Sequence, residues 1–134
     1  MSFSNQSCAG GTMDNAFLKH VKYNGGIDTE NYYSYTGEDP GAYDAGFVDV
    51  ASGDENALAD VLATVEPVSA AYCTSQLRCT MVVGHNTTKS RDDYWIVKNS
   101  WGKKWGDGGC ILMARNMGNN CGIATSASYP LVEI

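Results

Sequence analysis

The first apolar stripe of the sequence begins after Thr12 and has the period of a helix. Met13, Phe17 and Val21 recur four residues apart, which places them on one face of an α-helix. The pair Gly25-Gly26 ends the pattern, because glycine interrupts a helix readily. The sequence therefore predicts a helix between Thr12 and the glycine pair, with its apolar face in a core.

A second helix and four strands are predicted from Ser52 onward. The segment Ser52-x-x-Glu55 has the form of a capping box. An apolar helical stripe follows, made of Leu58, Val61, Leu62 and Val65. Short apolar runs predict strands at 68–72, 80–84, 94–97 and 110–114. Turn-forming residues at 36–47 and polar residues at 86–93 predict loops.

The composition is that of an ordinary globular domain. The chain has 134 residues, of which 43% are hydrophobic and 18% charged, and this length can form a single core. The net charge of −6, without a run of Lys or Arg, argues against a nucleic-acid surface. No apolar run approaches the ~20 residues that cross a bilayer. Met1 leads into polar sequence, so no signal peptide is expected and the compartment is not assigned.

The five cysteines cannot all pair within the chain, because their number is odd. Cys73, Cys79 and His85 are separated by five residues at each step, a set rich in nitrogen and sulfur. These separations are wider than those of usual zinc sites, so buried thiols are the simpler interpretation. No metal or other cofactor is expected.

The stretch 94–109 carries the most informative chemistry. An apolar run gives way to the polar step Lys98-Asn99-Ser100, followed by Trp101 and Trp105, each with a glycine after it. An asparagine at the end of a strand can orient another polar side chain while an indole excludes water. A catalytic imidazole needs such an orienting group, which fixes its tautomer and ring angle.

This stretch, Y-W-I-V-K-N-S-W-G-x-x-W-G-x-x-G-G, resembles the asparagine segment of papain-like cysteine proteases, and most closely that of the cathepsin L group. The resemblance implies that Asn99 is the catalytic asparagine and Trp101 the tryptophan that shields it. It implies an α+β, two-lobed papain-like fold that is incomplete here. Residues 1–44 would be the remnant of the helical lobe. Residues 45–134 would form an antiparallel, β-barrel-like lobe with a C-terminal crossover.

A second resemblance lies in C-A-G-G-T-M-D-N-A-F, which is similar to a substrate-groove segment of cathepsin L. It implies that Gly10 and Gly11 lie on the rim where a peptide pairs as an added strand, because glycine permits close approach. Met13 would line the pocket for an apolar substrate side chain. The implied partners are a peptide or a cystatin-like inhibitor, with no nucleic acid and no membrane.

The other catalytic residues do not match the family. The family's nucleophile segment, Q-G-x-C-G-S-C-W, does not occur in these residues. The family's histidine segment, D-H-[GA]-V-L-V-V-G-Y-G, aligns with 77–86 and places Arg78 at the histidine position. Arginine stays protonated and cannot act as a base. His85 is seven residues further on, and an odd step along a regular strand predicts that it faces the other way.

The resemblance also implies a Cys73–Cys121 disulfide, and it places the partner of Cys8 in the upstream segment. Cys79 and Cys110 are expected to be buried thiols. Two glycosylation sequons, Asn5-Gln6-Ser7 and Asn86-Thr87-Thr88, are of a kind that often arises by chance, and without a leader they would not meet the modifying enzyme.

We therefore expect a truncated, catalytically inactive cathepsin L-like protein, the product of a degenerate gene. One alternative is an active cysteine endopeptidase of the lysosomal type, in which another chain supplies the nucleophile and the base. The other is a non-catalytic protein that binds peptides or inhibitors through Gly10, Gly11 and Met13. The family is lysosomal or secreted.

Overall fold

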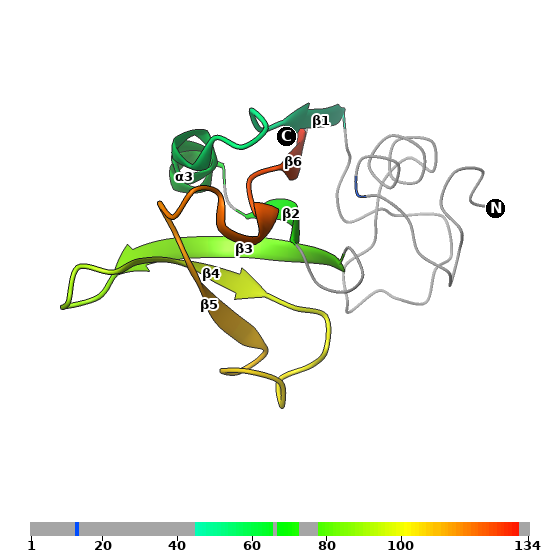
Figure 1. Cartoon of the computed structure of the whole chain (residues 1–134). Helices are drawn as coiled ribbons and strands as arrows, with labels where there is room; N and C mark the ends of the chain where they lie inside the picture. Colours follow the sequence, from blue (N-terminus) through cyan, green and yellow to red (C-terminus); the bar gives the residue numbers. More distant parts are fainter. Residues whose placement is uncertain (1–12, 14–44, 66, 73–77, 132–134) are drawn as a thin grey trace. The chain divides into compact units, whose positions relative to one another are not determined.

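The computed structural model describes residue 13 and residues 45–65, 67–72 and 78–131 (Figure 1). The contacts divide the chain into two compact units, Met1–Val48 with Pro130–Ile134, and Asp49–Tyr129. The structure describes almost all of the second unit, and most of the strands, the helix and the core reported below belong to it. The helix predicted after Thr12 lies outside the described residues, apart from Met13, which is helical and half-buried. The predicted boundary between 44 and 45 stays a prediction.

A six-stranded sheet forms the framework, in the order β1-β6-β2-β3-β4-β5. The strands are β1 (Gly46–Asp49), β2 (Val68–Tyr72), β3 (Arg78–Thr87), β4 (Asp93–Lys98), β5 (Cys110–Ala114) and β6 (Ser126–Leu131). The pairs β2–β3, β2–β6, β3–β4 and β4–β5 are all antiparallel. In the part of the chain that the structure describes, helix and antiparallel sheet together give the α+β class expected from the sequence.

The strand predictions at 68–72 and 110–114 are confirmed as β2 and β5. The strand predicted at 80–84 is longer, because β3 continues through Asn86 and Thr87. These polar residues lie opposite Tyr94 and Asp93 of β4, so their backbone groups are satisfied across the hairpin in spite of their polarity. The predicted polar loop is therefore shorter, and Figure 1 shows β3 as the longest arrow of the sheet.

Helix α3 (Glu55–Thr64) is confirmed, but its predicted start is wrong. The N-cap is Asp54, whose Oδ1 accepts hydrogen bonds from Asn56 N at 2.9 Å and Ala57 N at 3.0 Å. Ser52 Oγ instead donates to Thr125 O at 2.9 Å. Aspartate is as good an N-cap as serine, and the capping-box pattern did not reveal which residue takes that place.

The core lies between α3 and one face of the sheet. Leu58 and Leu62 of the helix are almost fully buried and pack with Val82, Trp95 and Val97. The alternation of buried and less buried residues in β2 and β4 matches a sheet with one face in the core. Figure 1 shows α3 beside β2 and β3, on that face. In the described part of the chain, no helix is long and apolar enough to cross a membrane.

A β-bulge interrupts the pairing of β3 with β4. Val82 lies opposite Val97, and Gly84 lies opposite Ile96, so Val83 is an extra residue in β3. An extra residue changes the parity of a strand, because side chains alternate between the two faces. A residue before Val83 and a residue after it therefore lie on the same face of the sheet when they are an odd number of positions apart.

Candidate functional site

Asn99 follows β4 directly and is one of the few buried polar residues in the described part of the chain, with 7% of its surface exposed. Its backbone N donates to Gly109 O at 3.0 Å. Its side-chain Oδ1 accepts from Ser100 N at 2.7 Å, which fixes the orientation of the amide. The remaining atom, Nδ2, is buried and has no hydrogen-bond partner among the residues that the structure describes.

The loop after Asn99 is shaped by glycines in left-handed conformations. Gly106 has φ +57°, and a Cβ there would collide with the carbonyl oxygen of Cys110. Gly109 has φ +96°, and a Cβ there would lie 3.3 Å from Gly102 O. These positions favour glycine both by conformation and by lack of space. Since Gly109 O accepts the bond from Asn99 N, the glycine loop holds the backbone of Asn99 in place.

Trp101 and Trp105 pack against each other in this loop. Their ring centroids are 4.9 Å apart and their planes are nearly perpendicular, at 87°. This edge-to-face arrangement is favourable for aromatic rings. Trp101 remains 44% exposed. The two tryptophans of the sequence motif are thus brought together, and the role of Trp101 as a shield for Asn99 stays a prediction.

The backbone of Arg78 is the start of β3, opposite Tyr72 of β2. Thr80 and Val82 are buried and alternate along β3, so position 78 belongs to the same row. Val82 lies opposite Val97, and Asn99 follows Val97 by two residues. Position 78 and Asn99 therefore belong to the same face of the sheet.

His85 lies on this face too, which corrects the prediction from its odd spacing. It is opposite Trp95 across β3 and β4, and its ring meets the buried Trp95 edge-on at 5.7 Å. The bulge at Val83 is the reason, because it reverses the parity of the strand. His85 is nevertheless distant from Asn99 along the sheet. Trp95 precedes Asn99 by four residues, or about 13 Å of strand.

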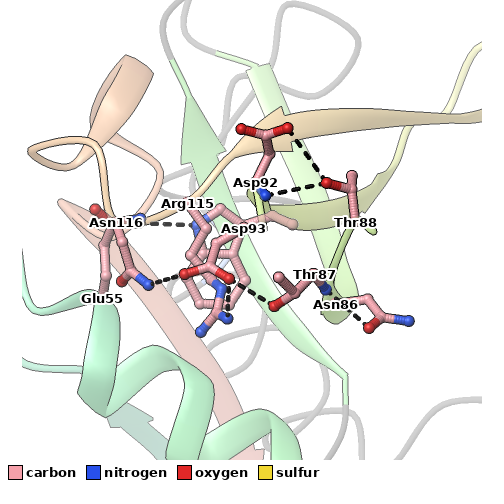
Figure 2. Close-up of polar contacts among 9 residues, drawn as sticks. Glu55, Asn86, Thr87, Thr88, Asp92, Asp93, Arg115 and Asn116 are labelled. Atoms are coloured by element: carbon pink, nitrogen blue, oxygen red, sulfur yellow. Dashed lines mark hydrogen bonds and ion pairs between the residues drawn. The ribbon is translucent and has the colours of Figure 1, made fainter. Parts of the chain in front are cut away.

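A polar cluster organises the other end of the β3–β4 hairpin (Figure 2). Asp93 Oδ1 accepts from Thr87 Oγ1 at 2.6 Å, and Asp93 Oδ2 accepts from Asn116 Nδ2 at 2.6 Å. Arg115 Nη2 lies 3.5 Å from Asp93 Oδ1. The hydrogen bonds from Thr87 and Asn116, together with the charge of Arg115, lower the pKa of the Asp93 carboxyl below its ordinary value.

Glu55 joins this cluster to the helix. Its Oε2 accepts from Trp95 Nε1 at 3.1 Å and from Asn116 N at 2.8 Å, and its Oε1 accepts from Asn119 N at 2.8 Å. Sequence reasoning assigned Glu55 to a local cap and missed these contacts. Asn119 has a left-handed φ of 55°, a conformation that asparagine tolerates, so an asparagine in the run Gly118-Asn119-Asn120 was the available signal for a tight turn.

The other predicted site residues are described only in part. Gly10 and Gly11 lie outside the described residues, and so do Cys8 and Cys73. Cys121 is half-buried in a short 3-10 helix, Asn120–Gly122, and its pairing with Cys73 stays a prediction. Cys110 is a free thiol and is only half-buried, less than expected. No three metal-binding side chains of the described residues converge.

Comparison with known proteins gives matches along nearly the whole chain. A family model described as papain family cysteine protease matches residues 1–80 and 72–131. The cathepsin L-like peptidase of Aedes aegypti is 44% identical over 160 positions, which cover 97% of this chain and 47% of that protein. Cathepsin L1 of Drosophila melanogaster is also 44% identical, with 97% and 43% covered. The chain thus spans about half the length of these relatives.

Solved structures agree with the sequence matches. The digestive procathepsin L2 proteinase of the Tenebrio molitor larval midgut superposes with a TM-score of 0.83 at 36% identity, covering 97% of this chain and 50% of that one. The bromelain protease of Ananas comosus, in complex with the E64 inhibitor, gives a TM-score of 0.82 at 27% identity, covering 94% of this chain and 72% of that one.

Proposed function

The chain belongs to the papain family of cysteine proteases, and we propose that it is a catalytically inactive, cathepsin L-like member. The observation that carries this proposal is the arginine at position 78. The family resemblance assigns this position to the catalytic histidine, and the pairing of β3 with β2 and with β4 supports a position on the same face as Asn99. Asn99 is therefore a preserved orienting residue without an imidazole to orient.

Arginine cannot perform both tasks of the histidine. The base of a cysteine protease keeps the thiol ionised and then protonates the leaving amine. A guanidinium stays protonated at any useful pH and has no acceptor atom. It could stabilise a thiolate by its charge, but it could not deliver a proton to the leaving group. This reasoning applies equally to a longer chain that contains these residues.

The matches support a further departure inside the chain. The alignment with the Aedes aegypti relative has 160 positions, more than the 134 residues of this chain. The family model matches in two segments that overlap at residues 72–80. This is the region where the family pattern S-F-x-x-Y-x-x-G-[IV]-Y has no counterpart. We infer that a stretch between the active-site segments is missing here.

The test is a peptidase assay on the folded chain with a fluorogenic peptide at acid pH. We expect no turnover above buffer for the wild type, and none for Arg78→His, because these residues contain no matching nucleophile segment. Turnover by the wild type that a thiol-directed epoxide blocks would overturn the proposal. A variant with all five cysteines replaced by serine is the matched control for contaminating activity.

A second candidate is a binding protein, and Asn99 favours it. A buried amide Nδ2 without an acceptor costs free energy, of order 1–3 kcal/mol. A bound peptide carbonyl would satisfy this atom and remove the cost. Titration with a cystatin-like inhibitor or a short apolar peptide tests this candidate. Saturable binding that Asn99→Leu weakens would support it, whereas a flat titration would end it.

A further inference from the structure

We propose that, when the chain enters the secretory pathway, Asn86 is an acceptor site for an N-linked glycan. Asn86-Thr87-Thr88 is the sequon of this modification, which requires a surface position. Asn86 lies near the end of β3, and the residues from 85 to 92 are all exposed. The sequon thus occupies the projecting tip of the β3–β4 hairpin (Figure 1).

The side chain of Asn86 presents the reacting atom to solvent. Its Oδ1 accepts a hydrogen bond from Thr87 N at 2.8 Å, so the amide is oriented with Nδ2 on the outer side. Figure 2 shows this nitrogen directed away from the other labelled residues. Within the described part of the chain, Nδ2 has no hydrogen bond, so attachment of a sugar there would break none.

The turn beyond Asn86 holds its shape without help from that side chain. Thr88 N donates to Asp92 O at 2.9 Å, and Arg91 N donates to Thr88 O at 3.0 Å. Asp92 N donates to Thr88 Oγ1 at 3.0 Å, and Thr88 Oγ1 lies 3.3 Å from Asp92 Oδ2. The folded hairpin can therefore carry a bulky group at Asn86 without rearrangement of the turn.

The reaction is a group transfer in which no atom is oxidised or reduced. A bond forms between Asn86 Nδ2 and the anomeric carbon of an oligosaccharide. The bond from that carbon to the diphosphate of a polyprenyl-linked donor breaks, Nδ2 loses one proton, and the polyprenyl diphosphate leaves. An oligosaccharyltransferase of the secretory pathway supplies the donor and the base, so the chain contributes only the acceptor.

The glycan site lies apart from Asn99 along β4. Asn86 is opposite Tyr94, which precedes Asn99 by five residues, or about 16 Å of strand. The proposal is independent of the proposed function, because it needs neither activity nor its loss. A glycan at the tip would add polar bulk to a chain with several exposed apolar side chains, among them Leu112 and Met117.

The test is expression of the full 134-residue chain behind a cleavable leader peptide in a secretory host. Total cell lysate and medium are both analysed under denaturing conditions, so a folding failure does not hide the result. We expect a mass shift that an N-glycanase removes, with conversion of Asn86 to aspartate found by peptide mass spectrometry. The Asn86→Gln variant should lose this shift, whereas Asn5→Gln should retain it.

Variants of Thr88 and Asp92 separate the sequon from the turn. Thr88→Ala should abolish the modification, and Thr88→Ser should keep it. Asp92→Ala is the matched control, because it removes the carboxylate to which Thr88 Oγ1 donates but leaves the sequon intact, and it should remain glycosylated. An unmodified Asn86 in the wild type, or a glycan present only at Asn5, would overturn the proposal.

Discussion

Glu55 Oε2 accepts a hydrogen bond from Trp95 Nε1 at 3.1 Å, and this bond joins the first turn of α3 to the buried strand β4. The same carboxylate also accepts from the backbones of Asn116 and Asn119. One side chain thus connects the helix, strand β4 and the loop after β5. Its removal should loosen all three together.

The first prediction concerns this carboxylate. Glu55→Gln replaces one acceptor oxygen by an NH₂ group that faces backbone or indole donors, so at least one bond becomes a repulsive contact. The free energy of unfolding should fall by ~1–3 kcal/mol. Urea unfolding monitored by tryptophan fluorescence measures it. Asp60→Asn, on the exposed face of the same helix, is the control, and an equal loss in both variants would contradict a specific role of Glu55.

The second prediction is a pH dependence that arises from Asp93. Its folded-state pKa lies below the ordinary value of 3.8. The main cause is the hydrogen bond from Thr87, followed by the hydrogen bond from Asn116 and the charge of Arg115. A lowered folded pKa adds stability above the unfolded pKa, and this stability is lost as the pH falls through the folded pKa. The urea midpoint of the wild type should therefore drop in acid.

Asp93→Asn should flatten this acid decrease, since the amide does not titrate. The comparison is made by urea midpoints between roughly pH 2 and pH 6, the range in which carboxylates titrate. Asp92→Asn changes the neighbouring carboxylate as a control. If the urea midpoint of Asp93→Asn falls in acid as much as that of the wild type, other carboxylates cause the pH dependence.

The third prediction concerns the side-chain amide of Asn99. Asn99→Leu removes a buried donor that has no acceptor among the described residues, while exposed Ser100 can exchange its lost bond for water. The free energy of unfolding should stay the same or rise by about 1 kcal/mol. Asn99→Asp should instead destabilise the chain, because it places a carboxylate in a buried site. A clear loss of stability in Asn99→Leu would mean that Nδ2 has a partner in solution.

The fourth prediction uses two glycines of the same loop. Gly106→Ala combines a positive φ with a collision against the Cys110 carbonyl and should cost ~3 kcal/mol or more. Gly108 also has a positive φ, of 61°, but nothing lies within 4 Å of its Cβ position. Gly108→Ala should therefore cost only about 1 kcal/mol, from backbone strain alone. Equal costs from thermal unfolding would rule out the collision.

The sequence predicted correctly those helices and strands in which the apolar residues recur with a regular period and form the buried face. The strands at 68–72 and 110–114 and the apolar stripe of α3 were found because each has a simple period and one buried face. The polar end of β3 was missed, because its stability comes from cross-strand partners and not from its own composition. Long-range pairing of this kind leaves no local signal.

The candidate site was predictable as a set of residue types but not as a geometry. The motif identified Asn99 and the two tryptophans, whereas the bulge at Val83 reversed the expected side of His85. A single extra residue depends on the partner strand, so alternation within β3 could not reveal it. The long-range contacts of Glu55 were hidden for the same reason, because Trp95 and Asn119 are 40 and 64 residues away.

The place of β5 at the end of the strand order has a consequence for the behaviour of the protein at high concentration. The strand Cys110–Ala114 has no charged residue, and Leu112 is 63% exposed. Unprotected edge strands are templates for pairing between molecules. Self-association through this strand is therefore expected at high concentration, and Leu112→Lys should reduce it.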